Sequence, residues 1–242
     1  MYKPFQEYLE QELQRFELQS LPIPEGLEWN TSERSKNKAE IQSWCYRSER
    51  LRKIRYTYID VGTSAQVLNC VAYPEHQYDL PILGIDLLSF GKKILVVIDF
   101  QPLFREPEYK AKYVAPMRAL RDKYDDLAQD LGMRFYDANQ YFSENLLFAK
   151  TDRETVDLRV MPAFKDYLQL YWELLDAAIP DKDPQAIQRI VAAQKDYDQY
   201  SAERDPAHGL FSSYFGPEWA ERFLYEFLFE DAVPVAAGVA RR

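Results

Sequence analysis

Hydrophobic positions near the N-terminus repeat at helical spacing. Phe5, Leu9, Leu13 and Phe16 fall on one side of a helix, and they predict a helix over residues 4–19. The segment Leu-Pro-Ile-Pro-Glu-Gly at 21–26 then interrupts regular structure, because proline and glycine are poorly suited to the interior of helices and strands.

Residues 41–100 have the hydrophobic spacing of β-strands. Ile54, Tyr56 and Tyr58 alternate with polar positions, which is typical of a half-buried strand. Short glycine-containing links at 62–65 and 90–92 predict hairpins, and hairpins imply antiparallel pairing. We expect strands over residues 44–47, 53–61, 66–73, 82–90 and 92–100.

Helical patterns dominate the rest of the chain. Pro162, Pro184 and Pro217 stand where first-turn prolines are common. Strands followed by helices in one chain predict an α+β fold with one antiparallel sheet between helices. We expect helices over 106–130 (interrupted near Pro116), 162–178, 184–203 and 217–229, a strand over 133–136, and a helix capped by Asp137 that reaches Phe148.

Composition narrows the class of protein. A chain of 242 residues can form one large domain or two small ones. It has no apolar run of about 18 residues and no signal-peptide core, so we expect a cytoplasmic protein without a membrane span. The two cysteines and two histidines lack metal-ligand spacing, so no metal site is predicted. Glycine-rich nucleotide-binding motifs are missing, so electrons for any redox reaction must come from a partner protein.

Charge and aromatic content each allow two interpretations. The net charge of −9 argues against nucleic acid as a partner. Residues 34–55 nevertheless hold eight basic and two acidic residues, a local +6 that leaves −15 elsewhere. This segment is either a docking face for an anionic partner or a solvated strand edge. The 15% aromatic content indicates an aromatic core or, less often, a pocket for a flat conjugated ligand.

Two segments carry candidate chemistry. Asp86 lies in the apolar strand Leu-Pro-Ile-Leu-Gly-Ile-Asp-Leu-Leu at 80–88, where lost hydration favours a protonated acid able to donate a proton. A buried aspartate held only by hydrogen bonds is the more common case. The segment Ser-Ala-Glu-Arg-Asp-Pro-Ala-His-Gly at 201–209 predicts a polar loop, which could line a site or merely end a helix.

The sequence resembles the ferredoxin-dependent bilin reductases. The resemblance rests on residues 67–74, on 80–88, on Asp-Phe-Gln-Pro-Leu at 99–103, on Tyr-Phe-Ser at 141–143, on 200–211 and on Trp-Ala-Glu-Arg-Phe at 219–223. It implies a three-layer α/β/α sandwich with a central antiparallel sheet, formed by residues 1–242 as a single domain. It also implies a biliverdin pocket between sheet and C-terminal helices, reduced ferredoxin as electron donor, and no bound flavin or metal.

The same resemblance implies roles for individual residues. Asp86 matches the family's central proton donor, and Asp205 matches an acid on the other side of the bilin. Lys150 matches a basic position near a propionate, and Arg204 beside Asp205 is expected to bind substrate as well. Asn69 stands where the phycocyanobilin-forming branch has histidine, and Thr57 where that branch has glutamate.

These differences favour one branch of the family. They imply two-electron reduction of biliverdin IXα at the C15=C16 methine bridge, a step in phycoerythrobilin synthesis in cyanobacteria, through a bilin radical. The resemblance also makes the +6 segment a plausible ferredoxin face, beside Lys92 and Lys93, and makes transfer of the product to a second bilin reductase plausible. The alternatives are a four-electron phycoerythrobilin synthase and a bilin carrier or lyase without redox chemistry.

Overall fold

The core of the molecule is an antiparallel sheet of eight strands. A computed structural model describes residues 1–34, 37–127 and 140–234 of the chain. The strands follow the order β1-β3-β4-β5-β6-β7-β8. Strand β2 pairs with the N-terminal part of β3, and β1 pairs with its C-terminal end. Their bounds are Gln19–Ser20 (β1), Trp29–Ser32 (β2), Ala39–Arg47 (β3), Leu51–Asp60 (β4), Ala65–Pro74 (β5), Ile82–Phe90 (β6), Lys93–Gln101 (β7) and Leu147–Thr151 (β8).

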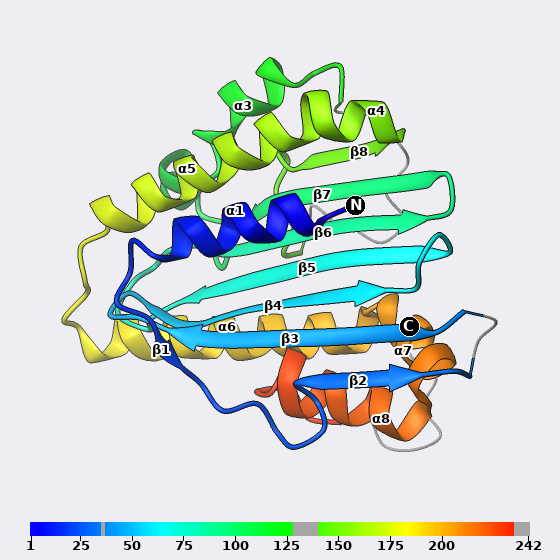
Figure 1. The fold of residues 1–242 in the computed structure, drawn as a ribbon. Helices are drawn as coiled ribbons and strands as arrows, with labels where there is room; N and C mark the ends of the chain where they lie inside the picture. The colour runs from blue at the N-terminus through cyan, green and yellow to red at the C-terminus, as the bar shows by residue number, and fades with distance from the viewer. Residues whose placement is uncertain (35–36, 128–139, 235–242) are drawn as a thin grey trace.

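Helices cover both faces of this sheet (Figure 1). One layer contains α1 (Lys3–Leu13) and α5 (Met161–Ala177), joined by an edge-on contact between Phe5 and Phe164 at 5.2 Å. The opposite layer contains α6 (Pro184–Arg204), α7 (Ala207–Phe215), α8 (Pro217–Arg222) and the π-helical turn η2 (Phe223–Leu228). The shorter elements are α2 (Pro107–Tyr113), α3 (Met117–Lys123), α4 (Arg153–Thr155) and η1 (Val156–Val160). The predicted α+β fold with a central antiparallel sheet is confirmed.

Strand register lines up two contrasting rows of side chains across the sheet. Successive residues of a strand point to opposite faces, and paired residues share a face. We call one of them the polar row; it consists of Ser43, Thr57, Asn69, Asp86, Val97 and Phe148, each paired with the next. The residues next to these along each strand point to the opposite face, which α1 and α5 cover. We call them the apolar row; it consists of Trp44, Tyr56, Cys70, Ile85, Ile98 and Leu147.

The strands predicted over 53–100 match β4 to β7 within two residues, the strand predicted over 44–47 covers only the second half of β3, and the short strands β1 and β2 were missed. The turns at Gly62 and Gly91 have φ of +61° and +62°, which glycine adopts without steric cost. The predicted helix to Phe148 is wrong at its end, since Leu147 begins β8. Pairing with β8 satisfies backbone groups of β7 that would otherwise be left at an edge. The predicted strand 133–136 and the cap at Asp137 lie outside the described residues.

Several helices begin or end at other residues than the sequence predicts. The first helix ends at Leu13 instead of residue 19, and Gln19–Ser20 forms β1. The helix expected over 106–130 is two helices, α2 and α3, separated near Pro116 as predicted. The polar loop predicted at 201–209 is wrong, because α6 runs to Arg204 and α7 starts at Ala207. Ala202, Glu203 and Arg204 are good helix formers, and only the residue before Pro206 turns extended.

Candidate active site

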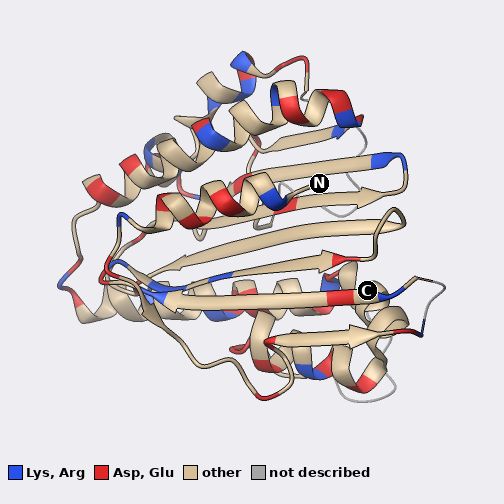
Figure 2. Cartoon of the chain, viewed as in Figure 1, with Lys and Arg blue, Asp and Glu red and all other residues tan. Residues whose placement is uncertain are grey.

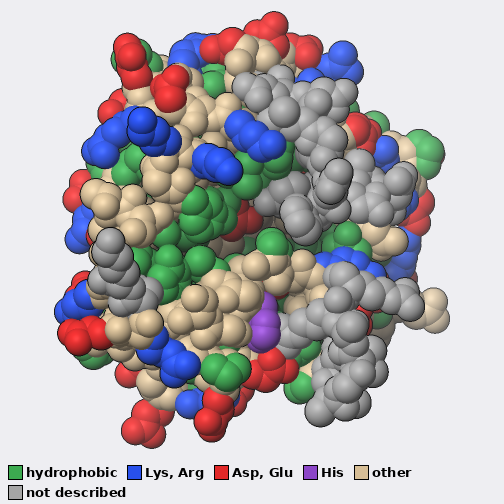
Figure 3. All heavy atoms as spheres, turned by 90° about the vertical axis from the view of Figure 1, so that its right-hand side faces the viewer, with side chains coloured by type: hydrophobic (Ala, Val, Ile, Leu, Met, Phe, Trp, Pro, Cys, Tyr) green, Lys and Arg blue, Asp and Glu red, His purple; other side chains and the backbone are tan. Residues whose placement is uncertain are grey.

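A cavity of about 610 Å³ lies between the sheet and the layer of α6, α7 and η2. This volume is within the ~300–1,000 Å³ of typical small-molecule sites. In the space-filling view it is a hollow in the middle of one face, with hydrophobic walls, an acidic side chain inside and basic side chains above it (Figure 3). Strands β4 to β8 supply one wall, and the helices supply the other.

Most of the wall is apolar and aromatic. Such walls suit a flat conjugated ligand, because ring faces stack on extended π-systems and the removal of apolar surface from water favours binding. The aromatic lining consists of Phe90, Phe142, Phe148, Tyr197, Tyr200, Phe211, Phe223 and Phe229. Few polar groups interrupt this surface, so those that do are candidates for orienting the ligand or reacting with it.

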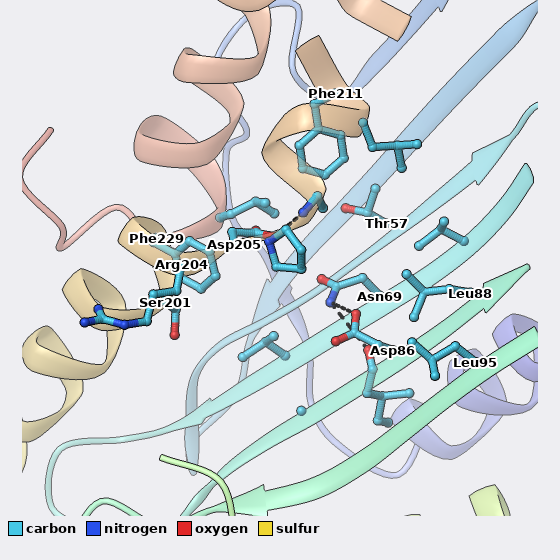
Figure 4. A pocket seen from close by; sticks show the side chains of 18 of the residues that line it. Thr57, Asn69, Asp86, Leu88, Leu95, Ser201, Arg204, Asp205, Phe211 and Phe229 are labelled. Atoms are coloured by element: carbon cyan, nitrogen blue, oxygen red, sulfur yellow. Dashed lines mark hydrogen bonds between the residues drawn. The ribbon is translucent and has the colours of Figure 1, made fainter. Parts of the chain in front are cut away.

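The polar row places an amide and a carboxylic acid side by side in the cavity. Asn69 on β5 and Asp86 on β6 are direct partners in the register. Asn69 donates from Nδ2 to Oδ1 of Asp86 at 2.6 Å (Figure 4). Farther along the row, the hydroxyls of Ser43 and Thr57 are 3.0 Å apart and hydrogen-bonded to each other. The predicted neighbours of Asp86 therefore share its face.

Asp86 has the surroundings of a proton donor. It lines the cavity and is half-buried among protein atoms. Burial raises the pKa of the Asp86 carboxyl, while the hydrogen bond from Asn69 and the charge of Arg55 partly oppose this effect. An acid whose pKa is raised toward neutrality can hold a proton and still release it.

Asp205 belongs to the helical wall, across the cavity from Asp86 (Figure 4). It is the last residue before Pro206 at the junction of α6 and α7. One of its carboxyl oxygens accepts a hydrogen bond from the backbone N–H of Ala207 at 2.8 Å. The structure thus brings the two predicted acids to one cavity from separate layers.

The two predicted basic residues differ in their placement. Lys150 lies on β8, lines the cavity and is exposed. Arg204 also lines the cavity, but its guanidinium points away from Asp86 (Figure 4). It donates to Glu203 at 3.1 Å and lies 4.4 Å from the ring centre of Tyr200. Lys150 is therefore the stronger candidate for an anionic group at the cavity mouth.

Arg55 was missed as a site residue. It belongs to the +6 segment that the sequence predicts to lie on the surface, yet it is 1% exposed and lines the cavity. It donates from Nη1 to Oδ1 of Asn69 at 2.5 Å and from Nε to the Leu228 carbonyl at 3.1 Å. The alternation of Ile54, Tyr56 and Tyr58 was a usable signal, because it places Arg55 on the same face as Thr57.

Other basic residues of the +6 segment also bind internal groups. Arg50 donates to the Leu175 carbonyl at 2.7 Å, and Arg52 to Gln194 at 2.5 Å. Lys53 is buried and donates to the Phe227 carbonyl at 2.7 Å. Figure 2 shows charged residues mostly on the helices and strand ends, including the blue β6–β7 turn that contains Lys92 and Lys93. Several cations of the segment therefore bind the helical layers on both faces of the sheet, which leaves fewer for a docking face.

Two further buried acids lie outside the cavity lining. Asp99 on β7 accepts from the backbone N–H and the hydroxyl of Ser143, and burial raises its pKa to about 7. Asp198 on α6 accepts from the Tyr73 hydroxyl at 2.8 Å, and burial raises its pKa to about 6. Both bind neighbouring segments and are structural residues.

The described part of the chain has neither a cluster of metal ligands nor a membrane-spanning helix. Within residues 1–34, 37–127 and 140–234, no group of three or more His, Cys, Asp and Glu is arranged to hold a metal ion. His208 lies 3.1 Å from Glu221 and connects α7 with α8. Cys45 and Cys70 are separate buried thiols. Among the helices that the structure describes, none has the length and hydrophobicity that crossing a bilayer requires.

Comparison with solved structures identifies the fold. The crystal structure of phytochromobilin synthase from tomato in complex with biliverdin superposes with a TM-score of 0.85 at 24% identity. The alignment covers 96% of this chain and 83% of that one. A central antiparallel sheet between helical layers is therefore the arrangement of a bilin reductase fold.

Sequence relatives identify the family. Proteins described as 15,16-dihydrobiliverdin:ferredoxin oxidoreductase from Nostoc punctiforme and Gloeobacter violaceus are each 67% identical, over 100% and 98% of both chains. One from Synechococcus sp. (strain CC9605) is 44% identical over 97% of this chain and 100% of its own length. A model of the family described as ferredoxin-dependent bilin reductase matches residues 6–230. The chain therefore belongs to the ferredoxin-dependent bilin reductase family.

Proposed function

We propose that this protein reduces biliverdin IXα at its C15=C16 methine bridge and releases 15,16-dihydrobiliverdin. Two relatives of 67% identity over 98–100% of their length carry the name of this activity, which supports the same chemistry here. The reaction adds two electrons and two protons to one double bond and leaves the A-ring and D-ring vinyl groups intact. Reduced ferredoxin, the electron donor of this family, supplies one electron at a time, so the bilin passes through a radical.

Asp86 supplies a proton to the bilin. The observation that carries this proposal is a half-buried acid, hydrogen-bonded to Asn69, in the wall of an aromatic cavity of about 610 Å³. Each added electron makes the bilin more basic, and a nearby carboxylic acid can then transfer its proton without a charged intermediate in an apolar site. Asn69 cannot exchange protons as histidine does, so its part is to orient Asp86 and the ligand.

Asp205 assists from the opposite wall. Its place across the cavity from Asp86 supports a role in the second protonation or in holding a water beside the bilin. Lys150, exposed at the cavity, binds a propionate of the substrate. Arg204 contributes less, since its guanidinium is occupied by Glu203 and Tyr200.

Ferredoxin docks on the face onto which the cavity opens. Lys92 and Lys93 are exposed in the β6–β7 turn on this side, whereas several cations of the +6 segment bind internal groups. Opposite charges would steer an acidic ferredoxin to this face, and the association rate would fall with salt. The product then passes to a second bilin reductase.

The test is an anaerobic assay of purified protein with biliverdin and reduced ferredoxin, followed by absorbance and by chromatography of the product. We expect 15,16-dihydrobiliverdin to accumulate even with excess reduced ferredoxin. Accumulation of phycoerythrobilin would instead identify a four-electron synthase. Unchanged absorbance of bound biliverdin would identify a carrier or lyase and contradict the proposed reduction.

A further inference from the structure

Arg55 is a buried cation in the cavity wall. It is 1% exposed, and among the described residues no carboxylate lies within 4.0 Å of its guanidinium in an ion pair. Its neighbours are neutral: the Leu228 carbonyl, the Asn69 amide, and the ring of Phe229 at 5.4 Å. A buried charge with no ion-pair partner in direct contact is costly for folding, so its position calls for a reason other than stability.

The chemistry of Arg55 determines how the Asn69 amide is turned. A guanidinium has only donors, so the atom of the amide that faces it must be the oxygen. The amide nitrogen is then directed at Asp86, to whose Oδ1 it donates at 2.6 Å. Because Asn69 is also held by the strand register beside Asp86, rotation of its amide would break both hydrogen bonds.

This orientation decides where Asp86 can carry a proton. Oδ1 accepts from Asn69, so it cannot also donate along that line, and the proton of neutral Asp86 belongs on Oδ2. Within the described residues, no hydrogen bond occupies Oδ2, which leaves this oxygen available to a ligand in the cavity.

We propose that Arg55 is a positioning residue of the reduction, which acts through Asn69 to keep the transferable proton of Asp86 on Oδ2. The proposal rests on the proposed function, in which Asp86 donates to the bilin. Its physical basis is the unbroken path from a permanent cation on β4, through an amide on β5, to an acid on β6.

Other charged or titratable groups also surround Asp86. The same cavity is lined by Tyr197, Tyr200 and Arg204 of α6, Lys150 of β8 and Asp205 at the α6–α7 junction, and Cys70 lies on the opposite face of β5. The charge of Arg55 lowers the pKa of Asp86, and so does the hydrogen bond from Asn69. Loss of Arg55 removes the first effect and frees the amide to turn, so both consequences raise the pKa of Asp86.

The experiment compares Arg55→Gln, Arg55→Lys and Asn69→Leu, alone and in the double variant Arg55→Gln/Asn69→Leu. Single-turnover reduction by reduced ferredoxin is measured against pH, and biliverdin affinity is measured separately by absorbance. Asp86 is titrated in the ligand-free protein by infrared spectroscopy of its carboxyl band, assigned with Asp86→Asn. Arg52→Gln is the matched control, because Arg52 is a partly buried arginine of the same strand that binds Gln194 outside the cavity.

We expect Arg55→Gln to bind biliverdin within a few-fold of wild type and to reduce it roughly 10- to 100-fold more slowly, the effect of losing one charge-assisted hydrogen bond. Proton donation requires protonated Asp86, so the rate falls as pH rises through the pKa of Asp86. That alkaline limb should move to higher pH in Arg55→Gln, move less in Arg55→Lys, and stay in place in Arg52→Gln. The double variant should be no slower than the slower single variant, since both remove one path.

Two results would overturn the proposal: a wild-type alkaline limb in Arg55→Gln, or a double variant whose loss is the product of the single losses. If Arg55→Gln does not fold, Arg55→Lys and Asn69→Leu give the same comparison with a cation retained. If wild type does not reduce biliverdin, the proposed function fails. The infrared titration of Asp86 in wild type and variants then still decides whether Arg55 acts on it.

Discussion

The polar row and the apolar row lie one residue apart along the same strands, yet they face different surroundings. Tyr56, Cys70 and Ile85 of the apolar row are almost fully buried under the α1/α5 layer. Thr57, Asn69 and Asp86 of the polar row face the cavity under the other helical layer. Because successive side chains of a strand point to opposite faces, one sheet can pack against helices on one face and line a reactive cavity on the other.

The two faces should therefore respond differently to substitution. Desolvated groups such as Arg55 and Asp86 cost folding free energy, whereas apolar contacts on the opposite face supply it. Changes in the polar row should alter reduction more than stability, and changes above the apolar row should do the reverse.

Asp86→Asn should give the largest effect on reduction. The amide keeps the size of the carboxyl but cannot donate an acidic proton, so turnover should fall by about 100- to 10,000-fold. Biliverdin should still bind, and a bilin radical should persist after the first electron. Anaerobic absorbance and electron paramagnetic resonance with reduced ferredoxin measure both effects. Turnover near that of wild type would refute the role of Asp86 as proton donor.

Phe164→Ala tests the opposite face. Phe164 is fully buried on α5 and contacts Phe5 of α1, so its truncation leaves a cavity between the two helices. The unfolding free energy should fall by about 3–5 kcal/mol, as measured by denaturant titration. The pH profile of reduction should remain that of wild type. A shifted profile with unchanged stability would contradict the division between the two faces.

The same comparison shows what the sequence could predict. Alternation of Ile54, Tyr56 and Tyr58 was enough to predict β4, and β5 to β7 were predicted from strand-like segments separated by short links such as 62–65 and 90–92. Asp86 stood out because a charge in an apolar strand is conspicuous. The family resemblance indicated Asn69, Asp205 and Lys150, and the structure brings all of them to one cavity.

Other features needed three-dimensional contacts. Strand β8 begins with three consecutive buried residues and shows no alternation, and its pairing with β7 is a long-range contact. Arg55 was counted as surface charge, because basic residues are mostly exposed and only the packing of η2 against β4 shows which one is buried. Arg204 was predicted beside Asp205, but its side chain turns along α6 toward Glu203.

Asp205→Asn sharpens the comparison between the two walls of the cavity. The variant amide oxygen can still accept from the Ala207 N–H, so the junction of α6 and α7 should keep its structure. We expect turnover to fall roughly 10-fold, less than for Asp86→Asn, because a water can replace a proton donor near the solvent. The rate of biliverdin reduction by reduced ferredoxin, compared among wild type, Asp205→Asn and Asp86→Asn, measures this fall in turnover. A loss as large as that of Asp86→Asn would show that the second acid is equally required.

Asp99→Asn has no expected effect on reduction and concerns stability alone. Asp99 lies on the same face as Asp86, but Ser143 covers it and removes it from the cavity. Its folded pKa of about 7 lies above the usual 3.8, so between these values the folded protein keeps a proton that the unfolded chain releases. The stabilisation is therefore complete below about pH 4 and is lost as pH rises through about 7.

The Asn variant cannot ionise, so the difference in unfolding free energy between wild type and variant should change with pH across this window, by up to about 1.4 kcal/mol per pH unit. Denaturant titrations at pH 5, 6, 7 and 8 give the slope, and Asp122→Asn, at an exposed acid on α3, is the control. Parallel pH curves for wild type and Asp99→Asn would show that Asp99 is ionised throughout. In that case Ser143 and the backbone stabilise a buried carboxylate at Asp99, which lies outside the cavity, whereas Asp86 combines burial with access to the cavity.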